Sequence, residues 1–217
     1  MQLKFFVVNP FRVNAYLLWN DNNEGVLIDP SVSNPSEQNE LVSFVREKGI
    51  VIKRVLNTHL HLDHVLGNAF VERTFGVKAE AHEKDIFLLD LQEEQARMFG
   101  LDNSDPAGPL GSFLADGDMV KVGEGNDAFE LKVLHIPGHS PGGLAFYLDC
   151  GPMGLSLLFS GDILFCGGVG RSDLIGGDEG LLMKGIEDKL MTLRPDTIVY
   201  PGHGPNTTIE NEGSWNL

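Results

Sequence analysis

The sequence has few cysteines, few basic residues and no long apolar run. Its two cysteines, Cys150 and Cys166, are too few for a disulfide framework, so we expect reduced thiols. Sixteen lysines and arginines stand against 31 acidic residues, which gives a formal net charge of −15. This charge disfavours broad binding of nucleic acid or of an anionic membrane surface, although bound divalent ions would still attract an anionic substrate.

Signals for export or membrane insertion are also missing. The apolar patch at residues 5–8 is shorter than the roughly 7–15 residues of a secretory signal, and no run approaches the roughly 18 residues of a membrane span. We therefore expect a cytoplasmic protein.

What the sequence does contain is a dense group of metal-capable side chains, in the motif Thr58-His59-Leu60-His61-Leu62-Asp63-His64. In an extended backbone, residues two apart point to the same side, so His59 and His61 can share one metal ion. Asp63 and His64 follow where an expected strand gives way to an expected helix, and this turn can aim them at a second ion. Imidazole and carboxylate ligands together suit zinc, iron or manganese.

Hydrophobic periodicity and turn residues predict alternating strands and helices along the chain. We expect a helix that begins near Glu37 with Ser36 as its N-cap, and a loop over residues 101–112. The strand at 50–56 is nearly all apolar, as for a strand buried on both faces. Further helices are expected at 65–75, 83–99 and 180–193, and further strands at 3–8, 14–19, 26–28, 77–81, 119–122, 129–136, 144–148, 155–159 and 197–200. The expected architecture is two mixed sheets, each covered on its outside by helices.

Three more candidate ligands each follow an expected strand and a glycine. They are His139 in Pro137-Gly138-His139-Ser140-Pro141-Gly142, Asp162 in Ser160-Gly161-Asp162, and His203 in Pro201-Gly202-His203-Gly204. An aspartate after a glycine is by itself usually a turn residue. Three such sites together with the histidine cluster predict that all of these side chains meet at the strand ends, where loops carry ligands.

These motifs resemble the metallo-β-lactamase superfamily of hydrolases. The motifs Asn57-Thr58-His59 and Gly170-Arg171-Ser172-Asp173-Leu174 add a resemblance to the small glyoxalase II (hydroxyacylglutathione hydrolase) branch of this superfamily. The resemblance implies an α/β fold, an αββα four-layer sandwich forming a single domain over residues 1–217. It also implies two divalent metal ions, with zinc expected and iron or manganese as alternatives. By position, the first metal would be held by His59, His61 and His139, and the second by Asp63, His64 and His203.

The resemblance further implies that Asp162 bridges the two metals, and that Asp63 and Asp162 take part in catalysis. The implied reaction is hydrolysis of S-D-lactoylglutathione to D-lactate and glutathione by hydroxide generated at the metals. A thioester suits such a site because a thiolate, with a pKa of about 8.5, leaves without a strong general acid. Larger glyoxalase II enzymes carry a C-terminal helical domain with basic glutathione contacts, and this sequence ends soon after His203, so a related thioester remains an alternative substrate.

Two other functions stay open on the sequence alone. A mononuclear iron persulfide dioxygenase shares this fold, although the motif Gly202-His203-Gly204-Pro205 favours the hydrolase. A non-catalytic metal-binding module would bind metal without hydrolysing any thioester, ester or lactone. The expected partner is a small-molecule thioester, with neither nucleic acid nor membrane, and the oligomeric state is left open.

Several residues beside these motifs have a structural and a functional interpretation. Asp29 is either a turn former or a partner of a ligand histidine. His82 and His135 are expected to be structural, and Arg171 with Asp173 is expected to form a local ion pair.

Overall fold

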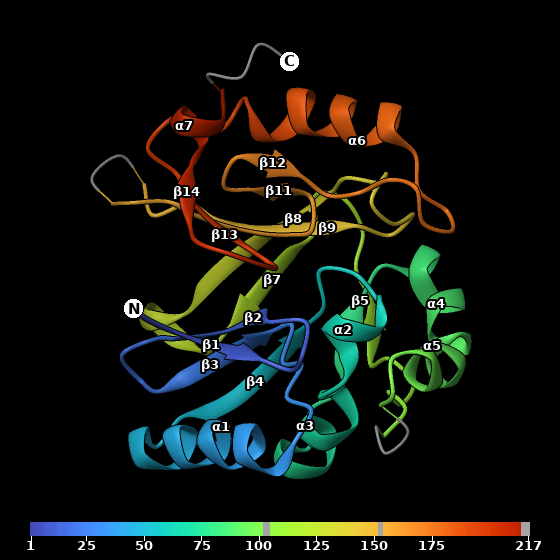
Figure 1. Ribbon diagram of the computed structural model, residues 1–217. Coiled ribbons are helices and arrows are strands. Elements are labelled where there is room, and N and C mark those ends of the chain that lie inside the picture. The colour runs from blue at the N-terminus through green and yellow to red at the C-terminus, as the bar shows by residue number, and fades with distance from the viewer. Residues whose placement is uncertain (102–104, 152–153, 214–217) are drawn as a thin grey trace.

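Two mixed β-sheets lie face to face, and helices cover the outer side of each (Figure 1). The computed structural model describes residues 1–101, 105–151 and 154–213, and within these residues each of the two sheets has six strands. The predicted loop at 101–112 lies partly outside the described residues.

The first sheet is built by the N-terminal half of the chain in the order β1-β2-β3-β4-β5-β6. Its first three strands form an antiparallel meander, and the later neighbours pair in parallel. The strands are β1 (Gln2–Val8), β2 (Val13–Trp19), β3 (Glu24–Ile28), β4 (Val51–Leu56), β5 (Ala79–Ala81) and β6 (Ser112–Phe113).

The second sheet follows in the order β14-β13-β10-β9-β8-β7. It is antiparallel except for the parallel pair β10 and β13. Its strands are β7 (Met119–Val122), β8 (Phe129–His135), β9 (Leu144–Leu148), β10 (Leu157–Gly161), β13 (Ile198–Pro201) and β14 (Thr207–Thr208), and a small ribbon pairs β11 (Leu164–Phe165) with β12 (Gly168–Val169).

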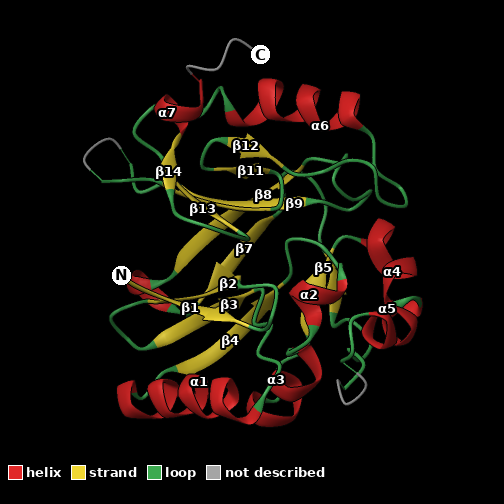
Figure 2. Ribbon diagram, in the orientation of Figure 1, coloured by secondary structure: helices red, strands yellow, loops and turns green. Residues whose placement is uncertain are grey.

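The helices lie on the two outer faces and along one side of the molecule (Figure 2). Helices α1 and α3 cover the first sheet, and α6 and α7 cover the second. The helices are α1 (Pro35–Lys48), α2 (Leu62–Val65), α3 (Asn68–Phe75), α4 (Ile86–Asp90), α5 (Gln92–Met98), α6 (Glu179–Gly185) and α7 (Ile209–Gly213), with 3₁₀ turns at η1 (Glu83–Asp85) and η2 (Gly125–Asp127) and a π-helical turn at η3 (Ile186–Leu190). No helix in the described ranges is long and apolar enough to span a membrane.

Separate apolar clusters hold the four layers together. Leu41 of α1 packs on the outer face of the first sheet, and Leu182 of α6 packs on the outer face of the second. Between the sheets, Leu56 of β4 shares a cluster with Phe146 of β9 and Phe159 of β10. Burying one such side chain stabilises the fold by about 1.5–3 kcal/mol. The predicted αββα sandwich of two mixed sheets is confirmed.

Several element boundaries differ from the prediction for local reasons. Helix α1 begins at Pro35 because the Asn34 side chain caps it, accepting from the backbone N–H groups of Ser36 and Glu37, so Ser36 is not the N-cap. Strand β4 is not buried on both faces, since Val51 and Lys53 are exposed. The predicted helices at 83–99 and 180–193 change to shorter helical turns along their length.

The predicted helix at 65–75 is in fact two, α2 and α3, separated at Leu66 and Gly67. A side chain at position 67 would collide with the backbone carbonyl of Pro30 and would come within 2.7 Å of the Val32 nitrogen. This close approach places the chain after α2 against the segment that follows β3, and the first helix ends at Val65, directly after His64.

The core makes a direct prediction about stability. Replacing the fully buried Phe146 by alanine is expected to lower the free energy of unfolding by about 3–5 kcal/mol, because it leaves a cavity between the sheets. Phe5→Ala is the control, since Phe5 is 53 % exposed, and it should change stability by about 0.5 kcal/mol. Urea unfolding measures both, and equal effects of the two substitutions would contradict the described packing.

Candidate metal centre

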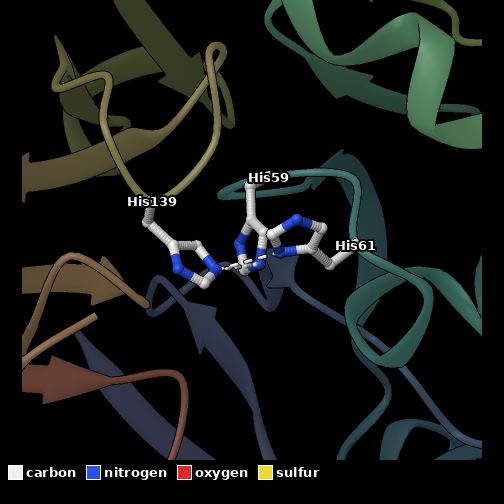
Figure 3. A group of neighbouring side chains, drawn as sticks. All are labelled: His59, His61 and His139. Carbon is white, nitrogen blue, oxygen red and sulfur yellow. Dashed lines mark hydrogen bonds between the residues drawn. The ribbon is translucent and has the colours of Figure 1, made fainter. Parts of the chain in front are cut away.

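Three imidazoles from two distant loops point toward one another (Figure 3). Nε2 of His139 lies 2.9 Å from Nδ1 of His61 and 3.2 Å from Nε2 of His59. Ligand nitrogens about 2.0–2.1 Å from a tetrahedral zinc ion are themselves about 3.3 Å apart. Leu60, between the first two histidines, is fully buried on the opposite side, as the alternation of an extended segment requires. The trio therefore has the spacing of three ligands around one ion.

A second group of ligand-type atoms adjoins the first. Nε2 of His203 lies 3.3 Å from Oδ2 of Asp63, and Nε2 of His64 lies 3.8 Å from the same oxygen. The rings of His59 and His64 are 4.1 Å apart between centroids, so the two groups are contiguous.

Asp162 lies between the two groups. Its Oδ1 is 3.3 Å from His64 Nε2, and its Oδ2 is 3.6 Å from His203 Nε2 and 3.7 Å from His139 Nε2. The structure thus brings all seven predicted side chains together, and each predicted set of three offers ligand atoms within 4.8 Å of one another.

Unsatisfied polar atoms show that these residues suit a cation. His64 Nε2 and Asp162 Oδ1 are buried, and neither makes a hydrogen bond of acceptable geometry to any residue that the structure describes. Leaving such atoms unpaired costs about 1–3 kcal/mol each, or more when charged. A divalent ion would coordinate both, so the donor set fits the metal that its chemistry implies.

The protonation preferences of the two groups differ. Burial lowers the pKa of His59 well below its ordinary value, and burial with the neighbouring His139 lowers that of His61 to about 4. Both imidazoles are neutral at neutral pH, the form that binds a metal ion. Burial would also lower the pKa of His64, but the carboxylates of Asp162 and Asp63 outweigh it and raise that pKa well above the ordinary value. This side of the centre attracts positive charge, either a proton or a metal ion that replaces it.

The sequence as a whole matches a known family. The family model described as the Metallo-beta-lactamase superfamily covers residues 8–203. This chain belongs to that superfamily.

Full-length relatives agree with this assignment. Hydroxyacylglutathione hydrolase GloC of Haemophilus influenzae is 37% identical to this chain, over 98% of this chain and 95% of the relative. The crystal structure of BLEG-1 B3 metallo-beta-lactamase superposes with a TM-score of 0.86 at 33% identity, covering 99% of this chain and 98% of that one. The crystal structure of TTHA1623 in a di-iron-bound form superposes with a TM-score of 0.82 at 36% identity, covering 98% of each chain.

Asp29 orients one imidazole of this superfamily member. Its Oδ2 lies 3.0 Å from His64 Nδ1 and accepts a hydrogen bond of 2.6 Å from the Thr58 hydroxyl, while its Oδ1 accepts one of 2.8 Å from the Thr58 backbone N–H. These contacts turn His64 Nε2 toward the centre. Asp29 also has a φ of 46°, so it forms the turn after β3 as well, and both interpretations of this residue hold.

Backbone carbonyls orient two other imidazoles in the same way. Nδ1 of His139 lies 2.8 Å from the carbonyl oxygen of Arg171, and Nδ1 of His203 lies 3.1 Å from that of Phe11. In each ring the opposite nitrogen, Nε2, then faces the centre.

Sequence reasoning missed Asp85, which is fully buried and joins two of the loops that carry histidines. Its carboxylate accepts hydrogen bonds from the backbone N–H of Leu60 at 3.3 Å, from the Ser140 hydroxyl at 2.7 Å and from the backbone N–H of Gly142 at 2.5 Å. Burial raises the pKa of Asp85, although these donors oppose the shift. Nothing in the local sequence distinguishes this aspartate from a surface residue of the predicted helix.

The other residues singled out beside the motifs make structural contacts. His82 caps η1 by accepting from the Lys84 backbone N–H, and its ring stacks on His135 with centroids 4.0 Å apart. Arg171 and Asp173 form the predicted ion pair at 2.7 Å, on the exposed surface.

Asp85 generates a prediction about the centre. Asp85→Asn should weaken metal binding about tenfold or more, because the amide cannot accept from all three donors that fix the two loops. It should also cost about 1–3 kcal/mol of stability. Competition with a chromogenic chelator measures the affinity. Asp188→Asn, at an exposed pair with Lys184, is the matched control, and the interpretation fails if both variants bind metal like the wild type.

Proposed function

We propose that this protein is a metal-dependent thioester hydrolase of the hydroxyacylglutathione type. Its substrate is S-D-lactoylglutathione or a related thioester, and its products are the hydroxy acid and the free thiol. One observation carries the proposal: two complete sets of ligand atoms adjoin each other, with the Asp162 carboxylate facing both. The similarity to a hydroxyacylglutathione hydrolase over nearly the whole chain supports the substrate class.

In this proposal the ligand roles follow the geometry. The converging nitrogens of His59, His61 and His139 hold the first ion. The second ion is held by Asp63, His64 and His203, and Asp162 serves both. Five imidazoles and two carboxylates suit zinc, which we propose as the metal, and they also suit iron or manganese.

When bound, the two cations supply Lewis acidity, which lowers the pKa of water toward neutrality and polarises a carbonyl oxygen. Asp63 and Asp162 present carboxylate oxygens on the same side of the centre, where each can accept a proton from the attacking water or orient it by a hydrogen bond. Asp29 and the Arg171 carbonyl keep the imidazoles aligned throughout. The chain's own residues thus supply position and proton acceptors.

The leaving group explains the preference for a thioester. A thiolate, with a pKa of about 8.5, departs without a proton donor, whereas an amine leaving group needs one. The five imidazoles that converge on this centre are assigned as ligands and the two carboxylates as proton acceptors for the attacking water, so none of the seven is set aside as an acid for the leaving group. An acyl–sulfur bond is therefore the better match to this site than an amide.

Release of free thiol from S-D-lactoylglutathione by a protein sample of known metal content tests the proposal. Wild-type protein with about two ions per chain should release thiol, and Asp162→Ala should lower the rate at least about 100-fold and reduce the metal content while the fold is kept. Asp196→Ala removes an exposed aspartate paired with Arg194 and should keep the wild-type rate. Full activity of Asp162→Ala would overturn the two-metal assignment.

The same assay tests whether a cysteine thiol acts as the nucleophile. Cys166 is exposed, and Cys166→Ala is expected to keep turnover within a few-fold of wild type because no step requires it. A collapse of activity would mean that the cysteine participates.

The dioxygenase alternative makes a different prediction. An iron persulfide dioxygenase would consume oxygen in the presence of glutathione persulfide, whereas the proposed hydrolase leaves dissolved oxygen unchanged. The second set formed by Asp63, His64 and His203 is expected in both kinds of enzyme, and it is the similarity to a hydroxyacylglutathione hydrolase over nearly the whole chain that favours the hydrolase. An oxygen electrode with iron-loaded protein measures the difference, and oxygen uptake without thiol release would decide for the dioxygenase.

A further inference from the structure

A cavity of about 420 Å³ is lined in part by His203 and by none of the other six candidate ligands. It lies between the turn that joins β1 to β2 and the loop after β13, and its lining includes Val7, Phe11, Arg12 and Asn14. This volume is within the roughly 300–1,000 Å³ of small-molecule sites. His203 lines this cavity and its Nε2 belongs to the candidate metal centre, so the cavity adjoins the centre.

The cavity contains an exposed and unpaired cation. The guanidinium of Arg12 makes no hydrogen bond or ion pair with any residue in the described ranges, in a chain with 31 acidic residues. Four of the other arginines are paired with carboxylates, namely Arg54–Glu80, Arg73–Asp105, Arg171–Asp173 and Arg194–Asp196, whereas Arg46 and Arg97 lie on helices away from this cavity. Arg12 is thus available to an anionic ligand.

Arg12 has an unusual backbone conformation, and the residues that follow it are bonded to the loop after β13. Its φ of 61° is in the left-handed region that favours glycine, which is uncommon for a long side chain. Val13 forms a β-bridge with His203, and the Asn14 side chain donates to the carbonyls of Pro201 at 3.0 Å and Gly204 at 2.9 Å. The turn that carries Arg12 is therefore attached to the segment that carries a candidate metal ligand, and the distance between cation and metal centre is fixed by the fold.

The geometry points to Arg12 as the residue that binds a carboxylate on the thiol part of the substrate. This inference rests on the proposed function, because the lactoyl group has no carboxylate and the charge of S-D-lactoylglutathione lies on its thiol part. A guanidinium presents two parallel N–H donors that match a carboxylate. The apolar side chains of Phe11 and Val7 flank it and give contact surface for the rest of the thiol. Arg12 thus acts as a binding residue that sets specificity, at a distance from the bond that is cleaved.

Binding of S-methylglutathione, an inert thioether, tests this inference by titration calorimetry on the metal-loaded protein. Arg12→Gln should raise the Kd about tenfold or more, the loss expected for a charge-assisted hydrogen bond, and Arg12→Lys should recover part of the affinity. Arg46→Gln, which removes an equally exposed arginine from the outer helix α1, should leave the Kd unchanged. The dimethyl ester of the same ligand should bind weakly to wild type and equally weakly to Arg12→Gln.

Each outcome separates the two proposals. If Arg12→Gln binds S-methylglutathione as tightly as wild type, or if wild type does not bind it, the role of Arg12 is overturned whatever the turnover. Binding that depends on Arg12, with no hydrolysis of S-D-lactoylglutathione by wild type, would support the anion site and overturn the proposed function. Arg12→Gly serves as a check on folding. Because glycine suits the left-handed backbone at this position, the variant should keep or raise the melting temperature while it raises the Kd, and a fall in melting temperature would show that the arginine is structural.

Discussion

The centre depends on one electrostatic constraint, which is that carboxylates and imidazoles are buried together with too few partners of their own. His64 is completely buried, and Asp29, Asp63 and Asp162 surround it. Buried charge of one sign is costly unless an opposite charge is close. A proton on His64 meets this need in part, while divalent ions would meet it more fully and would use the unbonded Nε2 of His64 and Oδ1 of Asp162.

Other features of the site, including the Asp29 and Asp85 contacts and the glycine before His203, keep these atoms close together. At that glycine, Gly202, a side chain would strike Asp162 and come within 2.8 Å of the His64 ring.

The site is shared between the two halves of the chain, so it exists only when both sheets are assembled. The first half contributes His59, His61, Asp63 and His64, and the second contributes His139, Asp162 and His203. Direct bonds cross between them: the Leu144 N–H donates to the Thr58 carbonyl at 2.7 Å, and the Asn14 N–H donates to the Gly202 carbonyl at 2.7 Å. The Tyr16 hydroxyl, in the apolar layer between the sheets, donates to the Pro201 carbonyl at 2.6 Å. Packing between the sheets and alignment of the ligands are therefore coupled, and a loss of either should weaken the other.

The sequence was most informative where chemistry and turn residues coincide. All seven candidate ligands were predicted because each lies in a short motif at a strand end. His59, His61, Asp63 and His64 stand out by their density, and His139, Asp162 and His203 each follow a glycine. The four-layer architecture was predictable for a similar reason, since the order of strands and helices limits the ways in which apolar faces can be buried. Asp85 was not predictable, because its partners Leu60, Ser140 and Gly142 are 25 to 57 residues away along the chain. The break between α2 and α3 was missed on the same ground, since the Pro30 carbonyl that meets Gly67 is distant in sequence. The single domain, the cytoplasmic location and the identity of the metal stay predictions.

The strong negative charge of the chain affects how an anionic substrate approaches the protein, whereas charges close to the site affect which substrate is bound. A net charge of −15 repels an anionic thioester at long range, and salt screens this repulsion beyond about 8–10 Å. Inside the cavity Arg12 contributes a positive charge that is paired with no carboxylate of the described residues, and cations bound at the adjoining ligand sets would add to it. A surface arginine such as Arg46 contributes only to the long-range field, which acts on every anion alike. In the role proposed for it, Arg12 acts at contact distance and so can distinguish a carboxylate on the thiol from one elsewhere. Selectivity for an anionic substrate on such an acidic protein would then come from a few local cations, and the β1–β2 turn places one of them next to the candidate metal centre.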